Sequence, residues 1–215
     1  MRMRKKKWSE PWLKEHEDYI FTIPTNQKGN WKDIFHCDKL HLEIGMGKGD
    51  YIIGMSNLYK NCGWIGLEKD ISAAATAARK VIDNNIDISN NRMICTDAIN
   101  IDEWFDENEI DVIHLNFSDP WPKKKYHKRR LSSETFIESY RKILVSKGLI
   151  IMKTDNEELF DSSIESFNNN HFIVKEINRD YRSEVHDEDS ITEYESKFIA
   201  EGKPIYRLIA INDKI

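Results

Sequence analysis

The sequence predicts an α/β domain with a mostly parallel sheet of seven strands, the last of them antiparallel, and helices on both faces. From residue 39 onward, short apolar runs alternate with longer amphipathic ones, which is typical of βα units. Glycines at every second position follow the first apolar run, and an acidic residue lies at the end of each of the first four runs. With 215 residues and 40% hydrophobic side chains, the chain is long enough for one domain with a sizeable core.

The expected elements follow from these runs. We expect strands near residues 40–44, 63–67, 92–96, 111–117, 148–153, 172–178 and 204–211. Helices are expected at 49–59, 71–84, 132–146 and 156–168, the second of them rich in alanine, which favours helix. No helix between the last two strands is long enough for a parallel crossover, so these strands should pair antiparallel. Residues 1–38 are expected to form an irregular, partly flexible extension, and residues 39–215 a single domain.

Cysteine usage and hydropathy restrict the class of protein. Cys37, Cys62 and Cys95 are odd in number and widely spaced, without a C-x-x-C pair, which argues against a disulfide framework or a zinc site. No segment has the apolar length of a signal peptide or a membrane span. The sequence therefore predicts a protein of the reducing cytoplasm.

Charge is distributed unevenly along the chain. The net charge is −5, but residues 1–7 hold five basic side chains and residues 123–130 hold six, with no acid in either segment. The rest of the chain carries 21 basic against 37 acidic side chains. An acidic body repels a polyanion everywhere except at such basic segments, which could therefore orient a nucleic acid. The context of residues 123–130 favours this interpretation over an ordinary charged loop, whereas for residues 1–7 a flexible basic tail is an equally good alternative.

The first strand ends in a glycine-rich turn, Gly45-Met46-Gly47-Lys48-Gly49. Glycine allows a tight turn and a close approach of ligand to backbone. The dinucleotide fingerprint G-x-G-x-x-G is not met, because Asp50 and not glycine follows Gly49. This departure disfavours a nicotinamide oxidoreductase.

Acidic residues mark four successive strand ends: Glu43, Glu68, Asp97 and Asp119. In a parallel sheet the carboxyl ends of the strands border one crevice, so these carboxylates should converge there. Taken alone, each acid is more often a helix cap or a solvated loop residue. Taken together with the glycine turn, they predict a ligand site.

This pattern resembles the Rossmann-like class I methyltransferases, which have E-x-G-x-G-x-G in the first turn and an acid after the second strand. The resemblance implies S-adenosylmethionine as the cofactor, whose ammonium, sulfonium, ribose diol and adenine amine suit carboxylate acceptors. By role, Glu68 would accept from the ribose hydroxyls, Asp97 from the adenine amine, and Glu43 would orient the methionine end, directly or through water. The implied cofactor-binding set is Glu43, Gly45, Gly47, Glu68, Asp97 and Asp119.

A second resemblance lies in the segment N-F-S-D-P-W-P-K at residues 116–123 and the basic run after it. It is similar to the hallmark segment of the tRNA guanine-N7 methyltransferase family. Further matches extend the likeness over residues 39–211: K-T-D-N at 153–156, T-E-Y-E at 192–195, K-F at 197–198, Gly202 and P-I-Y-R at 204–207. The family implies methyl transfer to N7 of a guanosine in tRNA, at position 46 of the variable loop. It implies that Asp119 serves the catalytic centre, and that substrate contacts come from Lys123, Asp155, Thr192, Glu193, Tyr194 and Glu195. RNA contacts are implied for Lys124, Lys125, Tyr126, His127, Lys128, Arg129 and Arg130.

The chemistry of N7 fits this implication. N7 of guanine is a lone pair with no proton to remove, so alignment matters more than a general base. Asp119 and Asp155 are then interpreted as positioning groups. Trp121 and Tyr126 either stack on a splayed base or pack the loop.

Several alternatives stay open at this point. Ser118-Asp119-Pro120-Trp121 partly resembles the D-P-P-W motif of adenine-N6 methyltransferases, although it has one proline between acid and aromatic. A catalytically dead RNA-binding module should have lost the glycine turn or Asp119, and neither is lost. His186-Asp187-Glu188-Asp189 is interpreted as solvated charge and no metal is expected. We expect tRNA as the partner, no obligate protein partner, and a monomer or homodimer.

Overall fold

The computed structural model describes residues 5–24 and 26–214. Arg2 and Arg4 of the first basic segment lie outside these residues.

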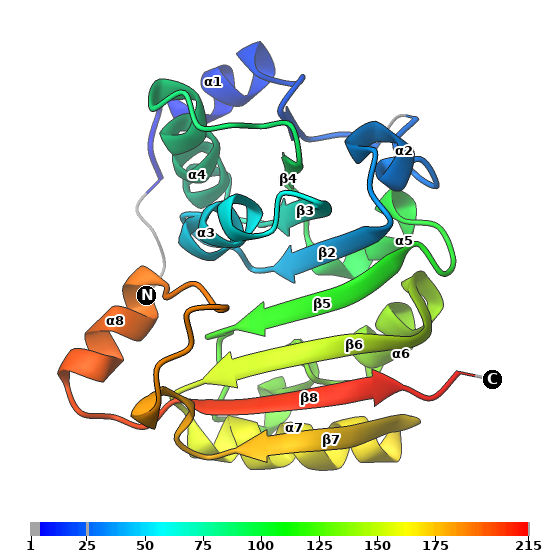
Figure 1. Ribbon diagram of the computed structural model, residues 1–215, viewed down its shortest axis with the longest axis vertical. Helices are drawn as coiled ribbons and strands as arrows, with labels where there is room; N and C mark the ends of the chain where they lie inside the picture. The colour runs from blue at the N-terminus through cyan, green and yellow to red at the C-terminus, as the bar shows by residue number, and fades with distance from the viewer. Residues whose placement is uncertain (1–4, 25, 215) are drawn as a thin grey trace.

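The described residues form one eight-stranded sheet with the strand order β1-β4-β3-β2-β5-β6-β8-β7 (Figure 1). The strands are β1 (Ile20–Phe21), β2 (Lys39–Ile44), β3 (Cys62–Leu67), β4 (Asn91–Ile94), β5 (Ile110–Asn116), β6 (Leu144–Thr154), β7 (Phe172–Asn178) and β8 (Tyr206–Asn212). From β1 to β6 neighbouring strands pair parallel, whereas β8 pairs antiparallel with both β6 and β7. The predicted fold class and the antiparallel pairing of the last two strands are confirmed.

Helices cover both faces of the sheet, as predicted. One hydrophobic core lies under α1 (Ser9–Glu15), α3 (Asp50–Leu58) and α4 (Ile71–Asp83). The other lies under α2 (Trp31–Phe35), α5 (Ile101–Trp104), α6 (Glu134–Ile143) and α7 (Glu157–Asn169). The remaining helix, α8 (Glu193–Ala200), lies beside the sheet edge where β5 and β6 end (Figure 1).

The prediction of an irregular N-terminal extension is wrong. Residues 9–35 form α1, β1 and α2, and they bury Leu13, Ile20 and Trp31 in the two cores. The indole N–H of Trp31 donates to the carbonyl of Trp104 at 3.0 Å. The sheet has one strand more than the seven predicted, and this additional strand is β1. With two residues, β1 is too short to show the alternating pattern of a strand in the sequence.

The boundaries of several elements also differ from expectation. The helix expected at 132–146 ends at Ile143, because Leu144 already pairs with Ile110 as the first residue of β6. Helices α5 and α8 were not predicted, since four and eight residues carry little periodic signal.

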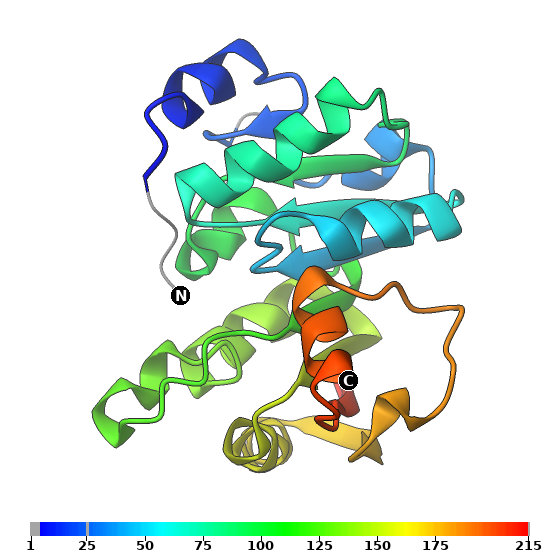
Figure 2. The same ribbon diagram turned by 90° about the vertical axis from the view of Figure 1, so that its left-hand side faces the viewer.

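All strands that pair parallel end at the same edge of the sheet. This carboxyl edge is on the left of Figure 1 and faces the viewer in Figure 2. The loops after β2, β3, β4 and β5 therefore lie together, where a ligand crevice is expected in such a sheet.

Candidate active site

A crevice of about 190 Å³ opens at the carboxyl edge, between the loops that follow β2, β3, β4 and β5. Each of these four strand ends contributes to its wall. The lining residues are Ile44, Gly45, Leu67, Glu68, Lys69, Asp97, Ala98, Phe117, Ser118, Asp119, Trp121, Arg129, Leu131 and Phe136. Three of the four predicted strand-end acids therefore meet in one cavity.

The glycine turn shapes the β2 side of the crevice. Gly45, Gly47 and Gly49 have φ angles of 80°, 57° and 77°, in the left-handed region where other residues are strained. A Cβ on Gly49 would lie 3.0 Å from the Cβ of Ala77, so glycine also lets α4 approach the turn. Gly47 has open space where a Cβ would stand, which leaves room for a ligand against the backbone.

Glu68 closes the β3 side. Its carboxylate accepts from the backbone N–H of Gly47 at 3.1 Å and of Asp70 at 2.8 Å. Asp70 in turn caps α4 by accepting from Ser72 and Ala73. Burial raises the pKa of Glu68, while the two backbone donors lower it. Each carboxylate oxygen keeps a second lone pair for a ligand hydroxyl.

Asp97 closes the β4 side and also caps a short helix. Its side chain accepts from the backbone N–H of Ile99 at 3.2 Å and so caps the short 3-10 helix Ala98–Asn100. It is exposed and lines the crevice. The capping interpretation is therefore confirmed, whereas the ligand interpretation stays a prediction with which the place of Asp97 on the crevice wall is compatible.

Glu43 differs from the other three acids, because it is buried behind the turn and does not line the crevice. It accepts from the Ile52 N–H at 3.2 Å and from Asn116 Nδ2 at 3.0 Å. Burial raises its pKa to about 7, with Asn116 and Lys153 opposing the shift. In this structure Glu43 joins β2 to α3 and β5, so of its two predicted modes only the indirect one is compatible with its place.

The loop from residue 117 to 131 forms the β5 side. Phe117 and Trp121 have φ angles of 49° and 40°, which are rare for bulky side chains and cost of order 1–3 kcal/mol each. Asp119 lies between these two residues, is exposed and lines the crevice. Backbone strain of this kind is typical of functional loops, which the surrounding structure holds in place.

The basic part of this loop is mostly the 3-10 helix Lys124–Arg129. Lys123, Lys124, Lys125, Lys128 and Arg129 are exposed, while Tyr126 and His127 are half-buried. The guanidinium of Arg129 lies over the rings of Trp121 and Tyr126, 5.1 Å and 4.8 Å from their centroids. Trp121 and Tyr126 thus pack within the loop, and the guanidinium of Arg129 covers one face of each ring.

Arg130 is a correction to the predicted RNA contacts. It is 4% exposed, donates to the Pro120 carbonyl at 2.7 Å and pairs with Glu158 at 2.8 Å. A buried guanidinium with these partners holds the loop against α7, and it is not available to a phosphate.

Residues 181–192, which we call the strap, cross α3 and lead into α8. Tyr59 donates to the Glu188 carbonyl at 2.9 Å, and the Ser190 N–H contacts Met55 Sδ at 3.3 Å. A Cβ on Gly54 would lie 2.0 Å from Ser190 Oγ, so this glycine is required for the strap to lie on the helix.

A buried ion network fixes the end of the strap to the sheet. Lys153, at the end of β6, is fully buried and pairs with Asp189 at 2.6 Å and with Glu195 at 3.1 Å. Arg182 pairs with the same two carboxylates, at 2.5 Å and 2.6 Å. Asp189, expected to be solvated, is therefore an internal counter-ion.

Glu195 is a second correction, because both its oxygens bind Lys153 and Arg182 and its side chain is 0% exposed. It also completes a capping box with Thr192 at the start of α8. The spacing T-x-x-E is a sequence signal for this motif and predicts Glu195 as a helix-capping residue. Its predicted substrate contact is not compatible with this place.

The other predicted substrate residues lie near the crevice. Glu193 pairs with Lys48 of the glycine turn at 2.7 Å, and Tyr194 is 55% exposed on α8. Phe198 of α8 stacks on Phe117 of the crevice wall with ring centroids 6.0 Å apart. Asp155 follows β6, next to the end of β5, and is half-buried.

A hydrogen-bonded chain extends from the strap across the sheet. Asp189 accepts from the Tyr51 hydroxyl at 2.9 Å, which contacts His114 at 3.1 Å, and His114 contacts His41 at 3.0 Å. Burial lowers the pKa of His41 to about 4 and that of His114 well below its usual value. Both imidazoles are therefore neutral at physiological pH and serve packing and hydrogen bonding.

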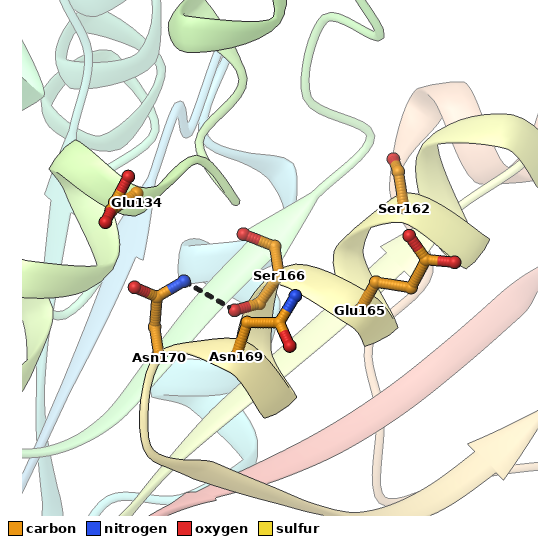
Figure 3. Close-up of a pocket in the computed structure, with 6 residues that line it drawn as sticks. All are labelled: Glu134, Ser162, Glu165, Ser166, Asn169 and Asn170. Carbon is orange, nitrogen blue, oxygen red and sulfur yellow. Dashed lines mark hydrogen bonds between the residues drawn. The ribbon is translucent and has the colours of Figure 1, made fainter.

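A larger depression of about 370 Å³ lies between the start of α6 and the end of α7 (Figure 3). Its walls are Glu134, Ser162, Glu165, Ser166, Asn169 and Asn170. Asn170 Nδ2 already donates to the Ser166 carbonyl at 2.8 Å. No residue that the motifs single out lies there, so the crevice at the carboxyl edge is the candidate active site.

Comparison with known proteins agrees with this assignment. Residues 38–208 match the model of a family described as "Putative methyltransferase". A tRNA (guanine-N(7)-)-methyltransferase of Limosilactobacillus reuteri is 43% identical over 212 residues, which cover 98% of this chain and 99% of the relative. The corresponding enzyme of Oceanobacillus iheyensis is 40% identical over 215 residues and covers all of both chains. The chain belongs to the tRNA (guanine-N7-)-methyltransferase family.

Solved structures show the fold of this family member in more distant proteins. A 16S rRNA methyltransferase, KamB, superposes with a TM-score of 0.65 over 90% of this chain and 99% of that one, at 10% identity. A 16S rRNA (adenine(1408)-N(1))-methyltransferase solved with its cosubstrate S-adenosylmethionine gives a TM-score of 0.62 at 9% identity, covering 86% of this chain and 91% of that one. At such identities the likeness supports the Rossmann-like methyltransferase fold alone.

Two further observations concern the described part of the chain. None of its helices combines the length and the apolar character needed to cross a membrane. Within the same residues, no group of three or more His, Cys, Asp or Glu side chains is arranged to hold a metal ion.

Proposed function

We propose that this family member transfers a methyl group from S-adenosylmethionine to N7 of the guanosine at position 46 in the variable loop of tRNA. It does so in the cytoplasm, as a monomer or homodimer without an obligate protein partner. One observation carries the proposal. The acids at the ends of β3 and β4 and the D-P-W-P segment after β5 border a single crevice whose outer rim is basic.

The crevice suits this cofactor. Glu68 and Asp97 supply acceptors for hydroxyl and amine groups, and Leu67, Ala98 and Phe136 supply an apolar surface between them. The left-handed turn at Gly45 and Gly47 leaves its backbone open to a ligand. When bound, S-adenosylmethionine supplies an electrophilic methyl group on a positively charged sulfur.

The residues of this chain then have to position a guanine. The N7 lone pair forms the new C–N bond while the C–S bond breaks, and no proton is removed. Asp119, exposed on the crevice wall, can accept hydrogen bonds from N1–H and N2–H of guanine, which adenine does not present in this pattern. With adenine, Asp119 would be left without these donors. A buried acceptor without a partner costs about 1–3 kcal/mol, so this contact favours guanine. Asp155 is proposed as a second positioning carboxylate.

The carboxylates also suit the movement of charge. Positive charge passes from sulfur to the purine ring, so fixed acids beside the path stabilise it throughout. Thr192 caps α8, which carries Glu193 and Tyr194 and contacts the crevice wall through the rings of Phe198 and Phe117. We propose that they contact substrate together with Lys123, whereas Glu195 positions them from inside.

RNA contacts are assigned to Lys124, Lys125, Tyr126, His127, Lys128 and Arg129. Their exposed cations neutralise phosphates beside the crevice. Arg129 covers Trp121 and Tyr126 in this structure, so a base that stacks on these rings has to displace its guanidinium.

Mapping the methylated nucleotide tests the proposal directly. The purified protein is incubated with tRNA and methyl-labelled cofactor, and the product is digested and sequenced by mass spectrometry. We expect 7-methylguanosine at position 46, and no label in a matched tRNA with adenosine there. Label at another position would refute the site, and label on an exocyclic amine would refute the acceptor atom.

A further inference from the structure

The N-terminal basic segment is held against the protein at the same edge as the crevice. The backbone N–H of Lys6 donates to Ser72 Oγ at 2.9 Å, and its ammonium donates to Thr76 Oγ1 at 2.9 Å. Trp8 packs beside this contact, with the Lys6 and Arg79 cations 5.4 Å and 5.0 Å from the centre of its ring. The segment is therefore anchored on α4 from residue 6 onward.

The residues of α4 that bind Lys6 follow closely in sequence after residues that line the crevice. Glu68 and Lys69 line the crevice, Asp70 caps α4, and Ser72 is the second residue of that helix. Lys6 is thus bound within one helical turn of residues that border the cavity. Figure 2 shows the N-terminal segment above, and the loop of residues 117–131 below, on the carboxyl edge of the sheet.

Among the described residues of this segment, no lysine side chain pairs with a carboxylate. Lys5 and Lys7 are exposed, and the Lys6 ammonium bonds to a hydroxyl and not to a carboxylate. Across the crevice, Lys124, Lys125 and Lys128 are also exposed. Eleven of the 32 basic residues of the chain fall in these two segments, which contain none of its 37 acids. The opening is therefore flanked by cations on two sides of an otherwise acidic molecule.

We propose that Lys5, Lys6 and Lys7, anchored on Ser72 and Thr76, form a second phosphate-binding surface for the RNA that enters the crevice. This inference rests on the proposed function for the identity of the RNA. A sugar-phosphate backbone long enough to pass from the 117–131 loop across the opening meets these lysines next. Their contacts orient the RNA and carry no base specificity.

The test measures tRNA affinity as a function of salt for two variants. In K5Q/K7Q two exposed cations are removed and the Lys6 anchor is kept. We expect the tRNA dissociation constant to rise roughly three- to tenfold and the slope of log K against log salt to flatten by about 1.5, as two lost phosphate contacts predict. The matched control K39Q/K142Q removes two exposed lysines from the opposite edge of the sheet and should leave the slope unchanged.

The second variant, S72A/T76V, keeps every charge and removes the hydroxyl partners of Lys6. It should weaken tRNA binding a few-fold with nearly the wild-type slope, because the cations remain but lose their position. Equal affinities and slopes for wild type, K5Q/K7Q and S72A/T76V would overturn the proposal. Binding to anionic phospholipid vesicles that K5Q/K7Q abolishes, with tRNA binding unchanged, would overturn it in favour of a membrane surface.

The two proposals fail in different ways. Equilibrium binding involves no methyl transfer, so an error in the N7 assignment leaves the slope comparison intact. Equal slopes with continued formation of 7-methylguanosine would remove the second surface and keep the proposed function.

Discussion

The cofactor side of the crevice and the substrate side, formed by the strap and α8 beside it, are held by different kinds of interaction. On the cofactor side, Glu68 and Asp97 accept from backbone N–H groups two to twenty-one residues away, around a turn of three glycines. On the substrate side, Lys153 joins Asp189 and Glu195, which are 36 and 42 residues away, through buried charges. The first side is a local consequence of its motifs, whereas the second exists only once distant segments have packed.

The largest effect is expected when the substrate side loses its buried cation. Lys153→Met leaves Asp189 and Glu195 buried with Arg182 as their remaining cation, and removing one partner of a buried ion pair costs about 3–5 kcal/mol. Urea unfolding at pH 7 measures this loss. The control K147M breaks the exposed pair of Lys147 with Asp213 and should leave the free energy of unfolding nearly unchanged. Similar small losses in both variants would show that the network does not hold the strap.

This contrast also explains what the sequence could predict. The glycine turn and the acids at strand ends are short motifs attached to strong periodic elements, so the sheet and the meeting of Glu68, Asp97 and Asp119 in one crevice could be predicted from them. The burial of Lys153 did not, because a lysine that ends an apolar strand gives no sign of which distant carboxylates reach it. For the same reason Arg130 and Glu195 were assigned to ligands, although internal partners engage both.

The N-terminal region was missed for a different physical reason. A two-residue strand and helices of seven and five residues are stabilised by packing on α4, β4 and Trp104, and not by their own periodicity. The capping box at Thr192 was visible in the sequence, and its spacing indicates the start of α8 and a capping role for Glu195, but not its burial against Lys153 and Arg182.

The cofactor side contains one buried carboxyl group, that of Glu43. The pH dependence of the free energy of unfolding that it causes is the next largest effect. The pKa of Glu43 is raised from 4.5 to about 7, so the unfolded chain binds fewer protons than the folded one between these values. Unfolding free energy should therefore fall as pH rises through this window, by about 3 kcal/mol in total.

Glu43→Gln should remove this slope. The Ile52 N–H still finds an acceptor, and Asn116 Oδ1, without a hydrogen-bond partner among the described residues, can turn toward the new amide. The measurement is the difference in unfolding free energy between the two proteins from pH 4.5 to pH 7.5. Parallel curves would mean that Glu43 ionises normally.

A smaller and more local effect is expected at Glu68. Glu68→Ala removes a charged acceptor worth about 1.5–3 kcal/mol and should weaken cofactor binding roughly 10- to 100-fold by calorimetry. Glu68→Gln keeps one acceptor oxygen, so its cofactor affinity should lie between that of the wild type and that of Glu68→Ala. The affinity for tRNA should stay within about twofold, since the acid faces the other ligand. An unchanged cofactor affinity in the alanine variant would refute the ribose assignment.

The smallest effect concerns the contact between α3 and the strap. Alanine in a helix is normally about 0.5–1 kcal/mol more favourable than glycine, but a Cβ on Gly54 meets Ser190. Gly54→Ala should displace the strap and raise KM for tRNA several-fold with a lesser change in kcat. The double variant G54A/S190G removes the obstructing atoms and should restore KM. If Gly54→Ala alone were more stable than the wild type and had a normal KM for tRNA, the strap would not position substrate.

The central claim is that N7 of guanine is the acceptor and that no residue of the crevice has to remove a proton. A tRNA with 7-deazaguanosine at the target position tests it, because C–H replaces N7 while N1, N2 and O6 are retained. We expect this tRNA to bind within a few-fold of normal, through its backbone and Watson–Crick edge, and to accept no methyl group above background. Robust methylation of the deaza tRNA would contradict the account, because it would place the methyl group on a different atom.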